Sequence, residues 1–233
     1  MLISEIRLVV RKQMVYPIAR YTLLPFIRFF IKKTVGFENI PIKGPYIIAC
    51  KHMGPLDGAF IGAVIIPKIN QKIHFVSRVA EWGWFWEKVV AEWWAGNIPF
   101  YKENPRICLE IALDYLKKGE IVGIFPEGIV QEYDSHKYRA KTGVARLAIW
   151  ARVPILPIGL VHDVTIRHDL PKLHRKRQVI KNILLNPHSL EIHIGQPFEV
   201  KEYYNKEITR DLLKEVTNVI MDRIDALTRI NGM

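Results

Sequence analysis

The chain has 233 residues and a mass of 27.1 kDa, which suits one domain or one domain with a small appendage. Hydrophobic residues make up 49% and charged residues 24%, a balance that excludes a chain disordered throughout. Two cysteines, Cys50 and Cys108, exclude a disulfide scaffold, and they do not have zinc-ligand spacing. Arg7, Arg11 and Lys12 interrupt the only apolar run that could resemble a signal peptide, so we expect an intracellular, reducing setting.

The net charge of +11 is concentrated in two segments. Residues 1–35 hold seven basic residues and one acid, and residues 171–182 hold five basic residues and no acid, so these segments account for the whole excess. Such segments suit either nucleic acid or an anionic lipid surface. No zinc-finger, RNA-binding or basic-zipper pattern is present, so we expect no nucleic-acid partner. A solvated loop is the simplest interpretation of residues 171–182, and a contact with a membrane or with an acidic protein partner is the alternative.

The N-terminal segment predicts contact with a membrane surface. Residues 14–31 are densely apolar and aromatic. Four residues break this stretch: Pro17, Arg20, Pro25 and Arg28. A membrane span needs about 20 mostly apolar residues without such breaks. We therefore expect residues 1–35 to form two helical pieces lying in the membrane interface, and residues 36–233 to form a separate domain. The alternative is an ordinary N-terminal helix packed on that domain.

After Gly36, apolar runs that predict strands alternate with helical patterns. The predicted strands are Tyr46–Cys50, Ile73–Ser77, Ile121–Phe125, Ile155–Leu160 and Ser189–Ile194. The predicted helices are Leu56–Ile66, Pro105–Lys117, Thr142–Trp150 and Ile208–Ile230. This order predicts an α/β domain whose mixed, largely parallel sheet is flanked by helices.

A histidine and an aspartate follow the first predicted strand of this domain. His52 lies in the turn after the strand, and Asp57 lies in the first turn of the next helix. From the turn, His52 comes within reach of Asp57, whereas on one continuous helix residues five apart diverge. A carboxylate bonded to Nδ1–H fixes the tautomer and leaves Nε2 as a base. The pair alone also fits a structural role, with Asp57 supporting the start of the helix.

The chain offers no protein nucleophile of a familiar kind. None of its four serines lies in a Gly-x-Ser-x-Gly elbow, and there is no Walker A or Gly-x-Gly-x-x-Gly loop. Cys50 lies on an apolar strand, where packing is the simpler role. A His–Asp pair without such a nucleophile predicts activation of a substrate hydroxyl or of water.

Three further stretches follow His52 and Asp57 in order: GNIPFYK at 96–102, IFPEG at 124–128 and VPILPI at 153–158. With these blocks, residues 40–165 resemble the glycerolipid acyltransferase family. The resemblance implies that His52 deprotonates the hydroxyl of a lysophospholipid and that Asp57 orients it. The hydroxyl then attacks the thioester of acyl-CoA or an acyl-carrier protein, with no acyl-enzyme, metal or cofactor. The expected acceptor is 1-acyl-sn-glycerol-3-phosphate, which would give phosphatidate at the cytoplasmic face of a membrane.

The resemblance also implies an acceptor site, with two departures from the family pattern. Lys102 replaces the usual arginine of the second block, and Glu127 and Gly128 match the third. Ile129-Val130-Gln131 replaces the usual Thr-Arg-Ser, so a phosphate-binding arginine is absent there. Arg139 and Lys141 are the nearby cations that we expect to compensate, together with Lys137. The departure leaves another lyso-lipid acceptor open as an alternative. A catalytically silent lipid-binding protein, held on the membrane by the basic N-terminus, is a further alternative, against which the intact His52–Asp57 pair argues.

Two other features have competing interpretations. Five of the six tryptophans lie between residues 82 and 94, which suits either an acyl-chain channel and membrane contact or plain core packing. His162, His168 and His174 are six residues apart, a spacing that does not align ligands on one helix face, so we expect no metal site.

Overall fold

The computed structural model describes residues 18, 20–52, 54, 56–78, 94–101, 103–128, 140–162, 181 and 185–228. Its strands form one sheet in the order β1-β7-β6-β2-β5-β3-β4. The strands are β1 Ile31–Val35, β2 Tyr46–Cys50, β3 Ile73–Arg78, β4 Ile98–Phe100, β5 Ile121–Ile124, β6 Ile155–His162 and β7 Leu190–Ile194. Neighbouring strands run parallel except for β6 and β7.

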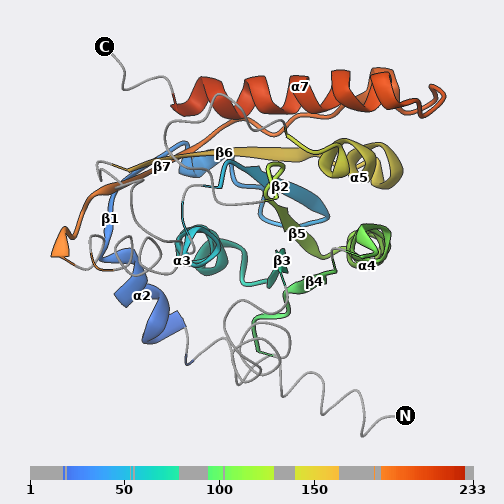
Figure 1. The fold of residues 1–233 in the computed structure, drawn as a ribbon. Coiled ribbons are helices and arrows are strands. Elements are labelled where there is room, and N and C mark those ends of the chain that lie inside the picture. The colour runs from blue at the N-terminus through green and yellow to red at the C-terminus, as the bar shows by residue number, and fades with distance from the viewer. Residues whose placement is uncertain are drawn as a thin grey trace, which may run out of the picture.

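Helices cover both faces of this sheet (Figure 1). They are α2 Leu23–Arg28, α3 Asp57–Ile69, α4 Pro105–Lys117, α5 Gly143–Ala151 and α7 Arg210–Thr228, with short 3₁₀ turns at Phe37–Asn39 and Lys201–Tyr203. Side chains of α2 and α3 share one core with the sheet, and those of α4, α5 and α7 share the other. The result is a three-layer arrangement with a separate core on each face.

The alternation of side chains along β2 divides it between the two cores. Tyr46, Ile48 and Cys50 belong to the core under α3, and Ile47 and Ala49 belong to the opposite one. All five are at most 1% exposed. A strand buried on both faces reads as a continuous apolar run, which is how the sequence predicted it.

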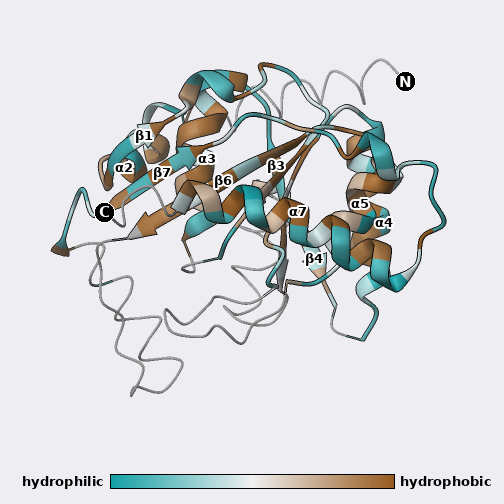
Figure 2. Cartoon of the chain, turned by 90° about the horizontal axis from the view of Figure 1, so that it is seen from above, coloured by the Kyte–Doolittle hydropathy of each residue, from teal (hydrophilic) through white to brown (hydrophobic). Residues whose placement is uncertain are grey.

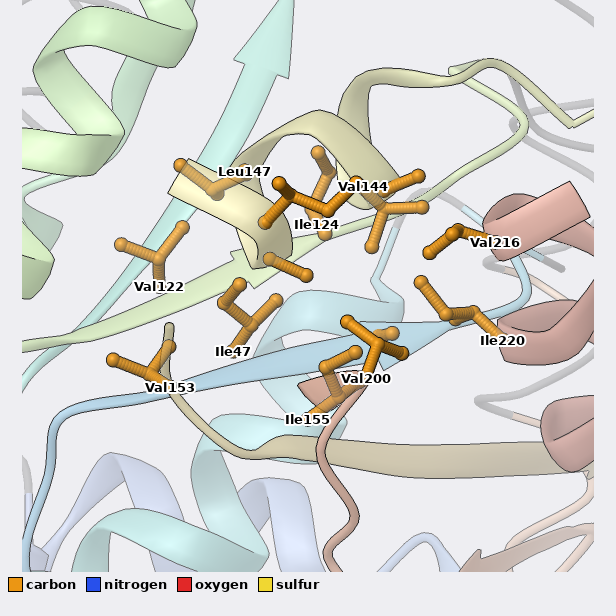
Figure 3. Close-up of a cluster of buried hydrophobic side chains, with 14 of the residues drawn as sticks. Ile47, Val122, Ile124, Val144, Leu147, Val153, Ile155, Val200, Val216 and Ile220 are labelled. Atoms are coloured by element: carbon orange, nitrogen blue, oxygen red, sulfur yellow. The ribbon is translucent and has the colours of Figure 1, made fainter. Parts of the chain in front are cut away.

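The core under α5 and α7 is built from small and branched side chains. Strand residues such as Ile47, Val122 and Ile155 meet Val144 and Ile220 of the covering helices (Figure 3). The strand β6 is coloured mainly as hydrophobic in Figure 2, whereas α7 carries both hydrophobic and hydrophilic residues. The helices therefore turn one face to the sheet and one to solvent.

The predicted fold class is confirmed: a mixed, largely parallel sheet flanked by helices. The strand β4 was not predicted, because three residues give too short a pattern. The helical prediction for residues 1–35 is wrong for residues 31–35, which form β1 beside β7. The segment Ile-Lys-Lys-Thr-Val suits an edge strand, since Ile31 is buried, both lysines are exposed, and Lys32 pairs with Glu191 at 3.0 Å. The sheet therefore begins inside the segment that the sequence assigned to the membrane interface.

The short helix α2 is packed on the domain. The Arg20 guanidinium donates to the Pro67 carbonyl at 2.7 Å and to Asn70 Oδ1 at 3.0 Å, at the end of α3. Leu24 is buried beneath the helix. The opposite side is apolar and exposed; its residues, here called the α2 apolar face, are Ile18, Tyr21, Leu23, Phe26 and Phe29. Residues 1–17 lie outside the described part of the chain. Among the residues described, no helix is both long enough and apolar enough to span a bilayer.

Candidate active site

The pairing of β2 with β5 brings two distant sequence blocks to one edge of the sheet. The strands are parallel neighbours, with Ala49 opposite Ile124. The residues that leave β2, including His52, therefore meet the turn that follows β5, Phe125–Gly128. Ligands of α/β proteins bind outside this carboxyl edge of parallel strands.

His52 and Asp57 form a hydrogen-bonded pair at this edge. His52 Nδ1 lies 2.9 Å from Asp57 Oδ2, and the Gly54 N–H donates to the same oxygen at 2.8 Å. Asp57 is the first residue of α3 and is 1% exposed, so its carboxylate lies at the positive end of the helix. The turn and the helix start thus bring together the two residues that the sequence singled out.

This geometry defines what the imidazole can do. A carboxylate oxygen only accepts hydrogen bonds, so Nδ1 carries the proton and Nε2 of the neutral ring is the proton acceptor. The His52 side chain is 19% exposed, so a substrate can approach the ring. An imidazolium formed there is stabilised by Asp57. The pair can act as a general base with its orienting acid.

Aromatic packing fixes the plane of the His52 ring. It stacks on Phe125 with centroids 4.2 Å apart and planes at 24°. Phe125 in turn stacks on Phe75 of β3 at 5.7 Å. Phe75 occupies the space beside Gly123 of β5, where an added Cβ would lie 2.2 Å from Phe75 Cδ1. The stack therefore depends on a glycine in the neighbouring strand.

Glu127 holds the main chain of the turn that carries His52. The His52 N–H donates to Glu127 Oε2 at 2.9 Å, and Glu127 is 2% exposed. Burial raises the pKa of Glu127 from 4.5 to about 7, against the opposing effects of the His52 N–H and the cation of Lys51. The carboxylate lies against protein backbone, and a direct contact with an acceptor stays a prediction.

The turn after β5 needs a glycine and brings Lys141 close. Gly128 has φ of +68°, a conformation that favours glycine, and its N–H bonds to the Phe125 carbonyl. The Lys141 N–H bonds to the Pro126 carbonyl at 2.8 Å, and the Lys141 side chain lies alongside Gly128. Of the predicted acceptor cations, Lys141 is thus beside the site, whereas Lys102 and Arg139 lie outside the described residues.

Several other predictions also fall on residues outside the described part. They concern Trp82–Trp93, His168, His174, residues 171–180 and the Ile129–Gln131 departure. Within the described residues, no cluster of three or more His, Cys, Asp or Glu side chains could hold a metal.

Cys50 behaves as a packing residue. Its thiol is buried and donates to the Lys51 carbonyl at 3.2 Å. Burial, and then the charges of Asp57 and Glu127, raise the pKa of this thiol. A buried thiol that stays protonated is a poor nucleophile.

Sequence reasoning missed three residues of this site. Phe125 lies inside the IFPEG block, but the sequence did not predict that it stacks on His52. Lys51 precedes His52 in the sequence, but its ion pair was not predicted. Its ammonium lies 3.4 Å from Asp225 Oδ1 on α7. Nothing in the sequence signalled Asp225, which is 174 residues further along the chain.

The sequence profile of the family described as Acyltransferase matches residues 32–161, more than half of the chain. The chain belongs to this acyltransferase family. The resemblance of residues 40–165 to glycerolipid acyltransferases is therefore confirmed. His52, Asp57 and the Phe125–Gly128 turn all lie inside the matched region.

Two curated relatives of the chain bear the same enzyme name. The chain is 31% identical over 131 residues to a 1-acyl-sn-glycerol-3-phosphate acyltransferase of Bacillus subtilis, over 54% of this chain and 60% of the relative. It is 28% identical over 151 residues to the chloroplastic 1-acyl-sn-glycerol-3-phosphate acyltransferase BAT2 of Brassica napus, over 61% and 40%. The aligned part thus spans about half the length of these relatives.

A solved structure has the same fold. The crystal structure of the 1-acyl-sn-glycerophosphate acyltransferase PlsC from Thermotoga maritima matches with a TM-score of 0.58 at 20% identity. The match covers 90% of this chain and 81% of the other. At that identity the likeness supports the fold of the chain and nothing finer.

Replacement of Glu127 by Gln tests whether burial raises the pKa of this carboxyl. Burial raises the pKa of Glu127 above its value in the unfolded chain. The stability of the fold is therefore greatest below about pH 4.5, where the carboxyl is protonated in both states, and falls as the pH rises to about 7. Gln keeps an acceptor for the His52 N–H without the charge. Between pH 4.5 and 7.5, the free energy of unfolding of Glu127→Gln should therefore rise relative to the parent by about 3 kcal/mol.

Chemical denaturation across this pH range measures the difference. Glu38→Gln, which removes an exposed carboxylate, is the matched control and should show no comparable change. A pH-independent difference for Glu127→Gln would mean that this carboxyl has an ordinary pKa.

Proposed function

We propose that the protein is a glycerolipid O-acyltransferase of phospholipid biosynthesis. It moves a fatty acyl group from acyl-CoA or acyl-carrier protein to the free hydroxyl of 1-acyl-sn-glycerol-3-phosphate, giving phosphatidate. The observation that carries the proposal is the His52–Asp57 pair, with a solvent-accessible ring, at the carboxyl edge of the sheet. The names of the two curated relatives support the acceptor.

In the proposed reaction, His52 Nε2 takes the proton of the acceptor hydroxyl as the oxygen attacks the thioester carbonyl carbon. The resulting imidazolium is stabilised by Asp57 Oδ2. Collapse of the tetrahedral intermediate forms the ester and breaks the carbon–sulfur bond. The leaving thiolate takes the proton from His52, which returns to its neutral form. General base catalysis of this kind contributes about 10²–10⁴-fold.

Cations beside the Phe125–Gly128 turn suit a phosphorylated acceptor. Among the described residues, Lys141 supplies a cation beside Gly128. Lys102 and Arg139 are proposed from the sequence to complete the phosphate site. A lysine offers a point charge and not the two-pronged donor of an arginine. Val130 in place of the usual arginine favours, as a second candidate, a lyso-lipid with another headgroup.

A membrane surface is the proposed site of action, because the lyso-lipid acceptor and the phosphatidate product reside there. The α2 apolar face presents exposed side chains, among them Tyr21 at 78% and Phe26 at 60%. Basic residues such as Arg28 and Lys33 lie next to this face in the sequence, and the whole chain carries +11. Apolar burial combined with attraction to anionic lipids suits peripheral association. We place the protein on the cytoplasmic face, as the sequence predicted.

The first test removes the base and its partner. His52→Ala should lower acyl transfer by at least about a hundredfold and leave the unfolding transition in place, since the ring is partly exposed. Asp57→Asn should also lose at least about a hundredfold, because the amide no longer enforces the tautomer. Mass spectrometry of the lipid product, with both donor classes, measures the rates.

The control for this pair is Asp114→Asn, at an exposed carboxylate on α4. Substantial turnover by purified His52→Ala would refute the assignment of the base. Lipid binding by the parent protein without consumption of either thioester would support a silent lipid-binding protein.

The acceptor site is tested by Lys141→Ala. Loss of this cation should raise KM for 1-acyl-sn-glycerol-3-phosphate by about tenfold, the equivalent of one charge-assisted hydrogen bond, with a smaller effect on acceptors that lack a phosphomonoester. Kinetics on a panel of lyso-lipids measure this difference, with the exposed Lys117→Ala as control. A parent enzyme that prefers acceptors without a phosphomonoester would favour the second candidate instead.

Membrane association is tested at the α2 apolar face. Phe26→Ser with Phe29→Ser should reduce co-sedimentation with anionic vesicles, and added salt should reduce it further. Ile107→Ser, at an exposed apolar residue of α4, is the matched control. Equal binding by the double variant and the parent would place the membrane contact elsewhere.

A further inference from the structure

Lys51 connects the catalytic turn to the C-terminal helix. Its Nζ lies 3.4 Å from Asp225 Oδ1, and the two side chains are 27% and 28% exposed. Lys51 directly precedes His52, and successive side chains of an extended segment point to opposite faces. Lys51 accordingly points to α7, on one face of the sheet, while His52 points to Asp57 and Phe125 on the other. The helices α7, which carries Asp225, and α3, which carries Asp57, lie on opposite sides of β2 in Figure 1.

The part of α7 that carries Asp225 is firmly seated on the sheet. Ile224, the preceding residue, is fully buried. Leu227 packs against two glycines: an added Cβ at Gly159 would lie 2.8 Å from Leu227 Cβ, and one at Gly195 would lie 3.2 Å from Leu227 Cδ1. The backbone that carries Asp225 is therefore held against the sheet, and its carboxylate is partly buried.

Glu127 brings a third charge to the same place. Its Oε2 accepts the N–H of His52, the residue after Lys51. The cation of Lys51 lowers the pKa of Glu127 and the charge of Asp225 raises it, so the three groups interact electrostatically. Among the described residues, Glu127 Oε1 has no hydrogen-bond partner, so the nearby cation of Lys51 helps to stabilise the ionised form of this buried carboxyl.

We propose that Lys51 and Asp225 are positioning residues for the His52–Asp57 pair. The ion pair fixes the side chain of residue 51 to α7, and Glu127 fixes the main chain of residue 52. Together they hold the imidazole between Asp57 and Phe125. Neither Lys51 nor Asp225 touches the reacting atoms. The inference rests on the proposed role of His52 as the base and adds a support that reaches the site from the C-terminal helix.

Kinetics of matched variants test the catalytic consequence. Lys51→Gln and Asp225→Asn should lower kcat by about tenfold to a hundredfold and leave KM for both substrates nearly unchanged, since misplacement of a base affects chemistry more than binding. Lys51→Arg, which keeps the cation, should restore most of kcat. Asp222→Asn, at an exposed carboxylate one turn earlier on α7, is the control. Partly exposed ion pairs contribute little to stability, so all variants should unfold as the parent does.

Amide hydrogen exchange of the substrate-free protein tests the physical link directly. The His52 N–H should exchange at least about tenfold faster in Lys51→Gln and Asp225→Asn than in the parent, and Asp222→Asn should match the parent. Unchanged exchange in both variants, or an unchanged kcat, overturns the inference. Turnover retained by His52→Ala contradicts the proposed base itself, a result that is separate from the exchange rates.

Discussion

The parallel pairing of β2 with β5 is the constraint on which the site depends. It sets Ala49 opposite Ile124, so that the chain leaves both strands at the same edge. The bond from the His52 N–H to Glu127 then joins residues 75 apart in the sequence. Both strands are apolar on both faces and nearly free of exposed surface, so their register is set by two cores at once. The contact between the two turns at this edge is thus a direct product of ordinary sheet packing.

Around that edge, both backbone and side-chain contacts hold His52 in place. The Asp57 carboxylate sits at the start of α3, where the helix favours an anion, and accepts both the imidazole and the Gly54 N–H. Glu127 holds the main chain, and Phe125 holds the plane of the ring. Three restraints therefore act on one residue, one on its main chain and two on its partly exposed ring. Such preorganisation costs nothing at the moment of reaction.

Much of this could be predicted from the sequence, for reasons that are local. Strands such as Tyr46–Cys50 are continuous apolar runs, and His52 and Asp57 are five residues apart across a turn that Gly54 marks. The missed elements lacked a local signal. The segment Ile31–Val35 follows a helical, aromatic stretch and becomes a strand because β7 offers it an edge. Asp225 acquires its place only through the packing of α7 on the sheet. Glu127 was singled out by its block, yet its contact with the backbone of His52 depends on the neighbouring strand.

The glycine at position 123 has a consequence for how this sequence can vary. It lies inside a strand, far from solvent, and touches no group that takes part in the chemistry. Phe75 nevertheless fills the space where its side chain would be, and Phe75 supports Phe125, which supports the imidazole. Substitution at this interior position is therefore restricted by the placement of His52 as well as by folding, because a single added methyl group would displace Phe75 and, through Phe125, the imidazole.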